Sequence, residues 1–347
     1  MSKNGFIRFT INFFKLAIVL FLIFESVYTG IAIFNKNIDN KFVLQQNNYG
    51  KNPLWLEDGD SNDIDLIYDK MDEVGEFATV YAIYKRACEK LMLTKAYGVR
   101  ATSTIDVRAA NITISVASNR TEQYLVAGVP EYNANQKVYS SYTNTIYVTD
   151  ANDDFLASVL KGMIQFADRG YSDGVNSYKQ KGKLSAMTEE GEVIEWATEY
   201  APEEPTAART YNDGEFKEKC NFVITPETIL EDSVSVERVF DEQYGMYLYT
   251  VKMSLDCSNN DEGSATYYEA KAIGDVLGEN MKSLTYSQMG IEMTLYSNGY
   301  MITWDTVQEW TLVYDILISK LSGTALNKKY EVFSYDPKEC EVVDFTK

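Results

Sequence analysis

Over much of its length this chain alternates polar and apolar residues with a period of two, and that pattern most restricts its fold. The alternation begins at Val99, directly after a helical stretch, and continues to Val107. A strand places successive side chains on opposite faces, so this period predicts half-buried antiparallel strands. Further strand-like stretches, rich in Tyr, Val and Thr, are expected at 112–116, 122–129, 137–148, 233–240, 244–255, 287–296, 300–313, 314–321 and 329–335.

Two pairs of these strands are expected to form hairpins. Asn298 and Gly299 lie between two strand-like runs, and an Asn-Gly pair is typical of the tight turns that join antiparallel strands. The stretches 233–240 and 244–255 predict a second hairpin.

Two segments have helical spacing instead. In 76–97 an apolar stripe recurs at i, i+3, i+4 and i+7, and Gly98 follows at a position typical of a helix C-terminus. A second stripe predicts a helix over 263–284. Residues 153–167 fit a helix or a strand, and we favour the strand. The acidic stretch 187–205, with two prolines, is interpreted as a surface loop.

The N-terminal residues predict a membrane segment. Lys3, Arg8 and Lys15 precede an apolar stretch, Leu16–Phe34, that Glu25 interrupts once. Cations before an apolar segment keep the N-terminus in the cytoplasm, and about 20 apolar residues span a bilayer. We therefore expect a single-pass anchor with an extracytoplasmic C-terminal domain. The alternative is a secreted protein, whose signal peptide is cleaved near Gly30.

The chain then divides into three parts. Residues 1–35 are the anchor, residues 36–75 form a polar, acidic stalk, and residues 76–347 form a β-rich extracytoplasmic domain.

Composition excludes several functions. The chain has no histidine, which removes Ser-His-Asp and Cys-His catalysis and His-ligated zinc. Its net charge of −19 argues against nucleic-acid binding, which needs clustered Lys and Arg. We expect no enzyme activity, no cofactor and no metal site.

The cysteines are scattered without metal-ligand spacing at Cys88, Cys220, Cys257 and Cys340. Their disulfide state stays open; if a bridge forms, Cys220 and Cys257 are the preferred pair.

Two acidic clusters could in principle form a calcium site or a catalytic carboxylate pair, and both are interpreted as solvated surface. Asp58, Asp60, Asn62 and Asp69 fall at calcium-loop positions, but the required glycine is Asp63. Carboxylates around Glu189–Glu195 fall in a predicted loop, where pairs arise from acidity alone.

The order of elements resembles a group of exported Gram-positive proteins that are similar to the LolA/LppX-like lipoprotein-carrier superfamily. The strings that carry the resemblance are 97–104, 211–220 and 224–229, followed by the strand, helix and meander of 244–335. The expected fold is α+β: an N-terminal transmembrane helix, then a curved antiparallel sheet covered by the helices 76–97 and 263–284. The resemblance implies that this sheet is an incomplete barrel, whereas the anchor and the lack of a lipobox cysteine are departures from the superfamily. It also implies an apolar groove that holds a lipid or acyl chain.

Two functions follow as hypotheses. In the first, the tethered domain binds an apolar ligand, a lipid or a lipoprotein-linked acyl chain, between sheet and helices. The groove residues would be Tyr81, Tyr84, Tyr247, Tyr249, Val251, Tyr267, Trp304 and Trp310. In the second, the same side chains fill an ordinary core, and the domain is an envelope adhesion or scaffold module with a protein or wall-polymer partner. The oligomeric state is not predicted.

Overall fold

The computed structural model describes residues 63–94, 96–109, 112–127, 138–152, 166–174, 176–188, 191–203, 224, 226–258, 266–267, 270, 281–316 and 319–347. The predicted anchor 1–35, its membrane contact through 16–34, residues 36–62, Cys220, and the ambiguous stretch 153–165 lie outside these residues. So do the calcium-loop positions Asp58, Asp60 and Asn62. Among the described residues no helix has the length and apolar character needed to cross a bilayer.

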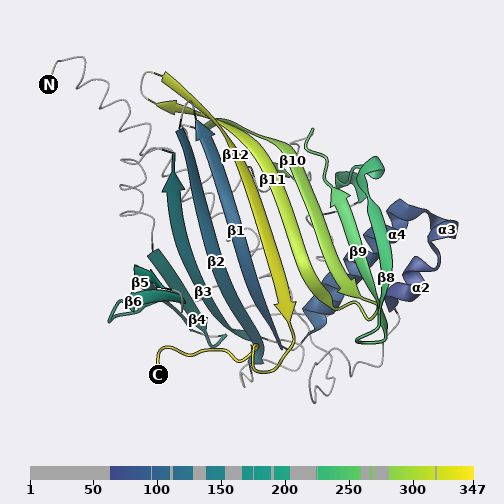
Figure 1. Cartoon of the computed structure of the whole chain (residues 1–347), viewed down its shortest axis with the longest axis horizontal. Coiled ribbons are helices and arrows are strands. Elements are labelled where there is room, and N and C mark those ends of the chain that lie inside the picture. Colours follow the sequence, from purple (N-terminus) through teal and green to yellow (C-terminus); the bar gives the residue numbers. More distant parts are fainter. Residues whose placement is uncertain are drawn as a thin grey trace.

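The fold is mostly β, built on one 12-stranded antiparallel sheet (Figure 1). The strand order is β6-β5-β4-β3-β2-β1-β12-β11-β10-β9-β8, and β7 also pairs with β5. The strands are β1 (Ala96–Ala109), β2 (Ile112–Ala127), β3 (Val138–Ala151), β4 (Phe166–Ser172), β5 (Ser177–Thr188), β6 (Gly191–Trp196), β7 (Ala201–Glu203), β8 (Ser235–Asp241), β9 (Met246–Ser254), β10 (Met281–Tyr296), β11 (Met301–Ile316) and β12 (Ser319–Ser334).

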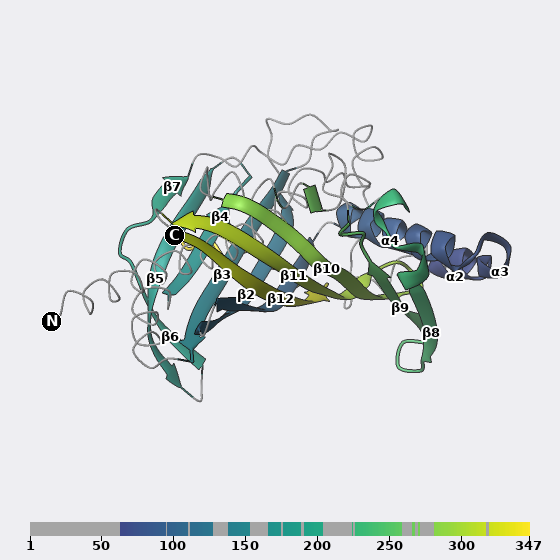
Figure 2. The same ribbon diagram turned by 90° about the horizontal axis from the view of Figure 1, so that it is seen from above.

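Two meanders meet in the middle of this sheet. Strands β1 to β6 follow one another on one side, and β8 to β12 follow one another on the other. They join where β1 pairs with β12, from Gly98 opposite Ser334 to Arg108 opposite Thr324. Seen from above, the joined sheet is curved (Figure 2).

The helices α2 (Asp63–Tyr68), α3 (Met71–Val74) and α4 (Glu76–Leu93) lie against one face of the sheet at the β8–β9 end (Figures 1 and 2). The predicted helix at 76 is confirmed, with Val80, Ile83, Tyr84, Ala87 and Leu91 buried in its stripe. Its end is not at Gly98: the helix stops at Leu93, because the chain from Ala96 onward pairs in β1.

The last part of the predicted stalk is folded. Ile64 of α2 is completely buried in the core, and Arg86 of α4 forms an ion pair with Asp63. Residues 63–75 therefore belong to the folded domain, which begins no later than Asp63. Among the acidic side chains of these helices, Asp72 and Glu73 of α3 are exposed, whereas Asp63 and Asp65 of α2 are half-buried.

Other expectations have mixed outcomes. The Asn298-Gly299 hairpin is confirmed, with Gly299 at a φ of 83° between β10 and β11, and the β8–β9 hairpin is also confirmed. The acidic stretch predicted as a loop instead contributes β6 and β7, which pair with β5. Part of the predicted second helix is wrong, because Met281–Leu284 begins strand β10, although Tyr267 and Ala270 are helical.

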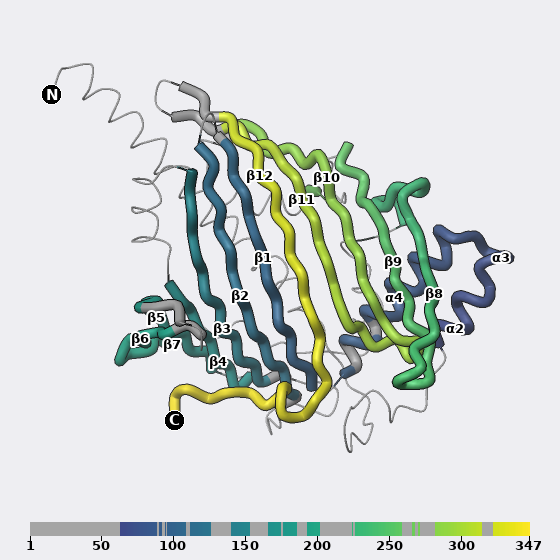
Figure 3. Tube along the Cα trace, viewed as in Figure 1, coloured from purple at the N-terminus to yellow at the C-terminus, as the bar shows by residue number. Residues whose placement is uncertain are grey.

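The alternation of side chains gives the sheet two different faces. The face toward α4, here called the helix-side face, carries the main core, which includes Tyr249, Val251 and Met253 of β9. The opposite face, here called the open face, carries Lys252 of β9 and most of the polar side chains of β8 to β12. Figure 3 traces the path by which the C-terminal tail, residues 335–347, crosses the ends of β1 and its neighbours.

Candidate functional site

The structure brings most of the predicted groove residues into the core at the helix–sheet interface. The rings of Tyr84 and Trp304 lie 6.1 Å apart between α4 and β11, and Tyr81 lies 6.3 Å from Tyr84. Within this core Tyr84, Tyr249, Val251, Trp304 and Trp310 are buried, and Tyr81 and Tyr247 pack against them. Tyr267 is half-buried in the short described helical segment.

Polar contacts fix several of these rings in place. The Tyr249 hydroxyl donates a hydrogen bond to Asp65 of α2, and its ring lies 5.4 Å from that of Tyr68. The Arg238 guanidinium lies 4.6 Å from the Tyr247 ring and 2.9 Å from Asp69 Oδ1. These contacts are those of a packed interface, in which the aromatic side chains touch one another.

A cluster of charges from β2 and β12 lies on the helix-side face, over β1; Arg120, Glu122 and Glu331 are buried, and the Lys329 side chain is 14% exposed. Arg120 Nη2 is 3.0 Å from Glu331 Oε1, and Arg120 Nε is 3.1 Å from Glu122 Oε1. Lys329 Nζ lies 2.8 Å from the same Glu331 oxygen. Burial lowers the pKa of Lys329 to about 8, although Glu331 acts in the opposite direction.

The sheet register explains how Arg120 reaches Glu331. Arg120 is opposite Ala101, and Ala101 is opposite Glu331, so all three share one row across β2, β1 and β12. Because Ala101 has only a methyl side chain, the arginine can extend over β1 to the carboxylate. With two charges of each sign, the cluster neutralises itself and is best explained as a structural network.

Sequence reasoning missed this cluster, although a signal was present. Ile114, Val116, Ser118, Arg120, Glu122 and Tyr124 alternate along one strand, and the apolar members at both ends mark that face as buried. The period of two therefore placed Arg120 and Glu122 inside; their partner Glu331 lies far away in the sequence.

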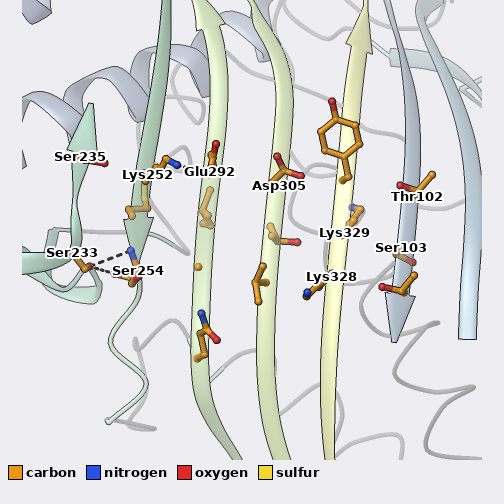
Figure 4. Close-up of a pocket in the computed structure, with 18 residues that line it drawn as sticks. Thr102, Ser103, Ser233, Ser235, Lys252, Ser254, Glu292, Asp305, Lys328 and Lys329 are labelled. Atoms are coloured by element: carbon orange, nitrogen blue, oxygen red, sulfur yellow. Dashed lines mark hydrogen bonds and ion pairs between the residues drawn. The ribbon is translucent and has the colours of Figure 1, made fainter. Parts of the chain in front are cut away.

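The open face carries a broad trough of about 710 Å³ that extends from β8 across β9, β10, β11 and β12 to β1 (Figure 4). Most of the residues that line it have polar side chains, although apolar atoms contribute the larger part of its accessible surface. The lining residues are Thr102, Ser103, Thr104, Ser233, Ser235, Lys252, Met253, Ser254, Gln288, Gly290, Ile291, Glu292, Asp305, Thr306, Val307, Lys328, Lys329 and Tyr330. None of the predicted groove residues lines it. It is a candidate binding site in the described part of the chain.

One row of opposed residues crosses the trough and sets its electrostatics. Lys252 is opposite Glu292, and Glu292 is opposite Asp305. Lys252 Nζ is 3.0 Å from Glu292 Oε2, and this hydrogen bond raises the pKa of Lys252. The pKa of Asp305 is also raised, first by desolvation and then by the neighbouring Glu292 and by Glu331.

The next row contains a gap. Gly290 is opposite Ser254 on one side and Val307 on the other, and a Cβ atom built at Gly290 would have no heavy atom within 4 Å. The missing side chain deepens the trough at its centre. A larger residue here would fill the trough without a clash in the fold.

The remaining predicted sites are placed as follows. Asp69 pairs with Arg238, while Glu189 and Glu190 lie outside the described residues. In the described ranges no group of three or more His, Cys, Asp or Glu side chains is placed to hold a metal ion.

No family model matches the chain, and no curated protein matches it. Among solved structures it is similar to a DUF1329 family protein from Desulfovibrio piger, with 6% identity and a TM-score of 0.20, over 74% of this chain and 93% of that one. It is also similar to the COG4313 outer membrane channel from Pseudomonas putida F1, with 9% identity and a TM-score of 0.21, over 69% and 94% of the two chains. Similarities at this level carry no argument about function.

Proposed function

We propose that this chain is a non-enzymatic binding module of the cell envelope, and that the trough on its open face holds an extended polar polymer of the wall. The observation that carries the proposal is the trough itself. Its volume of about 710 Å³ lies within the range of ligand sites, about 300–1,000 Å³. Its hydroxyl, carboxylate and ammonium groups suit a polar ligand.

The competing proposal, an apolar ligand between sheet and helices, needs space among the predicted groove residues. Those described at the interface are buried or pack against the core, and the adjoining part of the helix-side face, on β1, β2 and β12, holds buried charges. This arrangement supports the adhesion or scaffold hypothesis over the lipid carrier that the LolA/LppX-like resemblance implies. The anchor at 16–34, the extracytoplasmic location and the incomplete-barrel geometry remain parts of the proposal.

Gly290→Tyr tests the proposal directly. The purified full chain is incubated with insoluble cell-wall material, and the bound fraction is measured after sedimentation. We expect binding by the natural chain and at least about a tenfold loss in Gly290→Tyr, because the new ring occupies the trough.

Ser322→Tyr is the matched control. Ser322 is exposed on the open face of β12, six residues from Lys328 and so about 20 Å along the strand. This variant should bind like the natural chain. Equal binding by all three proteins, or no binding by any, would overturn the proposal; co-purified lipid in native mass spectra that Gly290→Tyr leaves unchanged would favour the carrier.

A further inference from the structure

If the proposed function holds, the charges in the trough restrict the class of ligand that it can bind. Its cations are Lys252 and Lys328 on the open face, and its anions are Glu292 and Asp305. Lys329 also lines the trough, but its ammonium group lies at Glu331 in the buried cluster. The open-face charges therefore cancel within the trough, although the whole chain carries a net charge of −19.

A strongly charged ligand of either sign meets opposition in this site. A polyanion would approach two carboxylates, and Lys252 is already engaged by Glu292 at 3.0 Å. Binding of phosphate chains depends on clustered Lys and Arg, which the described trough does not present. A polycation would encounter the ammonium groups of Lys252 and Lys328.

The hydrogen-bonding groups favour a ligand that both donates and accepts. The carboxylates only accept, the ammonium groups only donate, and the Ser and Thr hydroxyls do both. Along one row the order is Ser235, Lys252, Glu292, Asp305, Tyr330 and Thr102, so donors and acceptors stand on neighbouring strands. A hydroxyl group on a ligand can bridge such neighbours without bringing a charge.

The shape of the trough fits a chain of rings. Adjacent strands lie about 4.8 Å apart, so the span from β8 to β1 is about 24 Å. Tyr330 is 44% exposed and offers an aromatic surface, and Gly290 leaves open space at the centre. The apolar face of a pyranose ring can pack on the tyrosine while its hydroxyls reach the polar row.

We infer that the trough binds a neutral, hydroxyl-rich glycan that lies across the strands. This inference rests on the proposed function and names the ligand class of the same site.

The test uses the purified full chain and four soluble probes: a neutral oligosaccharide of wall-type β-linked hexoses, the same oligosaccharide bearing phosphate, the same bearing amines, and an uncharged peptide. Affinities are measured by calorimetry at low and high salt. We expect the neutral oligosaccharide to bind best, with an affinity that changes less than about threefold with salt because no charge pairing is involved. Gly290→Tyr should lower the affinity for the neutral oligosaccharide at least about tenfold, and Ser322→Tyr should leave this affinity unchanged.

The Asp305→Asn variant distinguishes neutral from phosphorylated ligands, because it should change the two affinities in opposite directions. Loss of a charged hydrogen-bond acceptor should lower the affinity for the neutral oligosaccharide about threefold to tenfold, and raise the affinity for the phosphorylated one. If the phosphorylated, aminated or peptide probe binds best and is lost in Gly290→Tyr, the glycan inference is wrong while the proposed function stands. If no probe binds, and wall material also fails to bind, both are wrong.

Discussion

At the scale of single residues, the side chains that face the interior of β1, β2 and β12 show how a sheet can bury charge. Arg120 crosses the small Ala101 to meet Glu331, and Lys329 approaches the same carboxylate from its own strand. Each charge is matched by an opposite one within about hydrogen-bond distance. Glu331 contacts both cations, so its carboxylate compensates the charges of Arg120 and Lys329 together.

Glu331→Gln should therefore be strongly destabilising. Removing one member of a buried ionic network leaves uncompensated charge and costs about 3–5 kcal/mol. The free energy of unfolding, measured with urea, checks this. The control is Glu339→Gln, whose partner Arg100 lies 2.6 Å away but is 70% exposed, so a loss below about 1 kcal/mol is expected. Similar losses in both variants would show that the buried network contributes little.

The same cluster predicts a dependence of stability on pH. Burial lowers the pKa of Lys329 from 10.5 to about 8, so the folded chain releases this proton at lower pH than the unfolded chain does. The unfolded state binds more protons in this window, and stability should rise as pH increases from about 8 toward 10. Below about pH 8 the unfavourable effect is fully present.

Urea unfolding between about pH 7 and 10 measures this rise. Lys329→Met should lack it, whereas Lys328→Met, next to it on the exposed side of β12, should retain it. A curve for Lys329→Met that rises like that of the natural chain would exclude Lys329 as the source.

At the scale of elements, the C-terminal tail is held across the open face by the strands beneath it. Glu339 pairs with Arg100 of β1, and the Phe345 ring lies 4.6 Å from the Arg169 guanidinium of β4. A Cβ atom at Gly98 would lie 2.6 Å from the Glu339 carbonyl oxygen, closer than such atoms normally approach. Only glycine lets the tail come this near to β1.

Gly98→Ala should loosen the tail. The clash requires a backbone shift and should cost about 1–3 kcal/mol of unfolding free energy. Amide hydrogen exchange across 336–347 should become faster, while exchange in β9 and β10 should change little. Gly290→Ala is the control, because its Cβ meets nothing within 4 Å and should leave both exchange and stability nearly unchanged. Unaltered exchange of the tail in Gly98→Ala would show that the close approach does not hold it.

At the scale of the whole molecule, the sheet depends on a single strand that joins its two meanders. β12 pairs with β1 on one side and β11 on the other, although it comes from the end of the chain. Without it, the interior edges of β1 and β11 would lose their hydrogen-bond partners.

Truncation after Ile316, which removes β12 and the tail, should abolish cooperative unfolding. Truncation after Asp336, which removes most of the tail but keeps β12, should retain a single transition at lower stability. Circular dichroism during urea unfolding distinguishes the two. A cooperative transition in the shorter protein would show that one meander folds without the other.

Local features of this fold could be predicted from the sequence, and the predictions that were wrong have physical causes. The hairpin strand at 244–255, the Asn298-Gly299 turn and the stripe of α4 follow from neighbouring residues and were confirmed. The stretch 187–205 is predicted as a loop, but 191–196 and 201–203 form strands at the edge of the sheet, because acidic residues and proline suit an edge strand as well as a loop. Met281–Leu284 was misjudged because its apolar residues fit a helix as readily as the start of a strand.

The sequence by itself determined the period of each element, the turns between adjacent strands, and which side of a strand is apolar, because these depend on residues a few positions apart. Only the tertiary structure decided that β12 enters between β1 and β11, that Arg120 meets Glu331, and that the polar side chains of β8 to β12 and β1 line one trough. Those relations join residues far apart in the chain, and only the register of the assembled sheet brings them together.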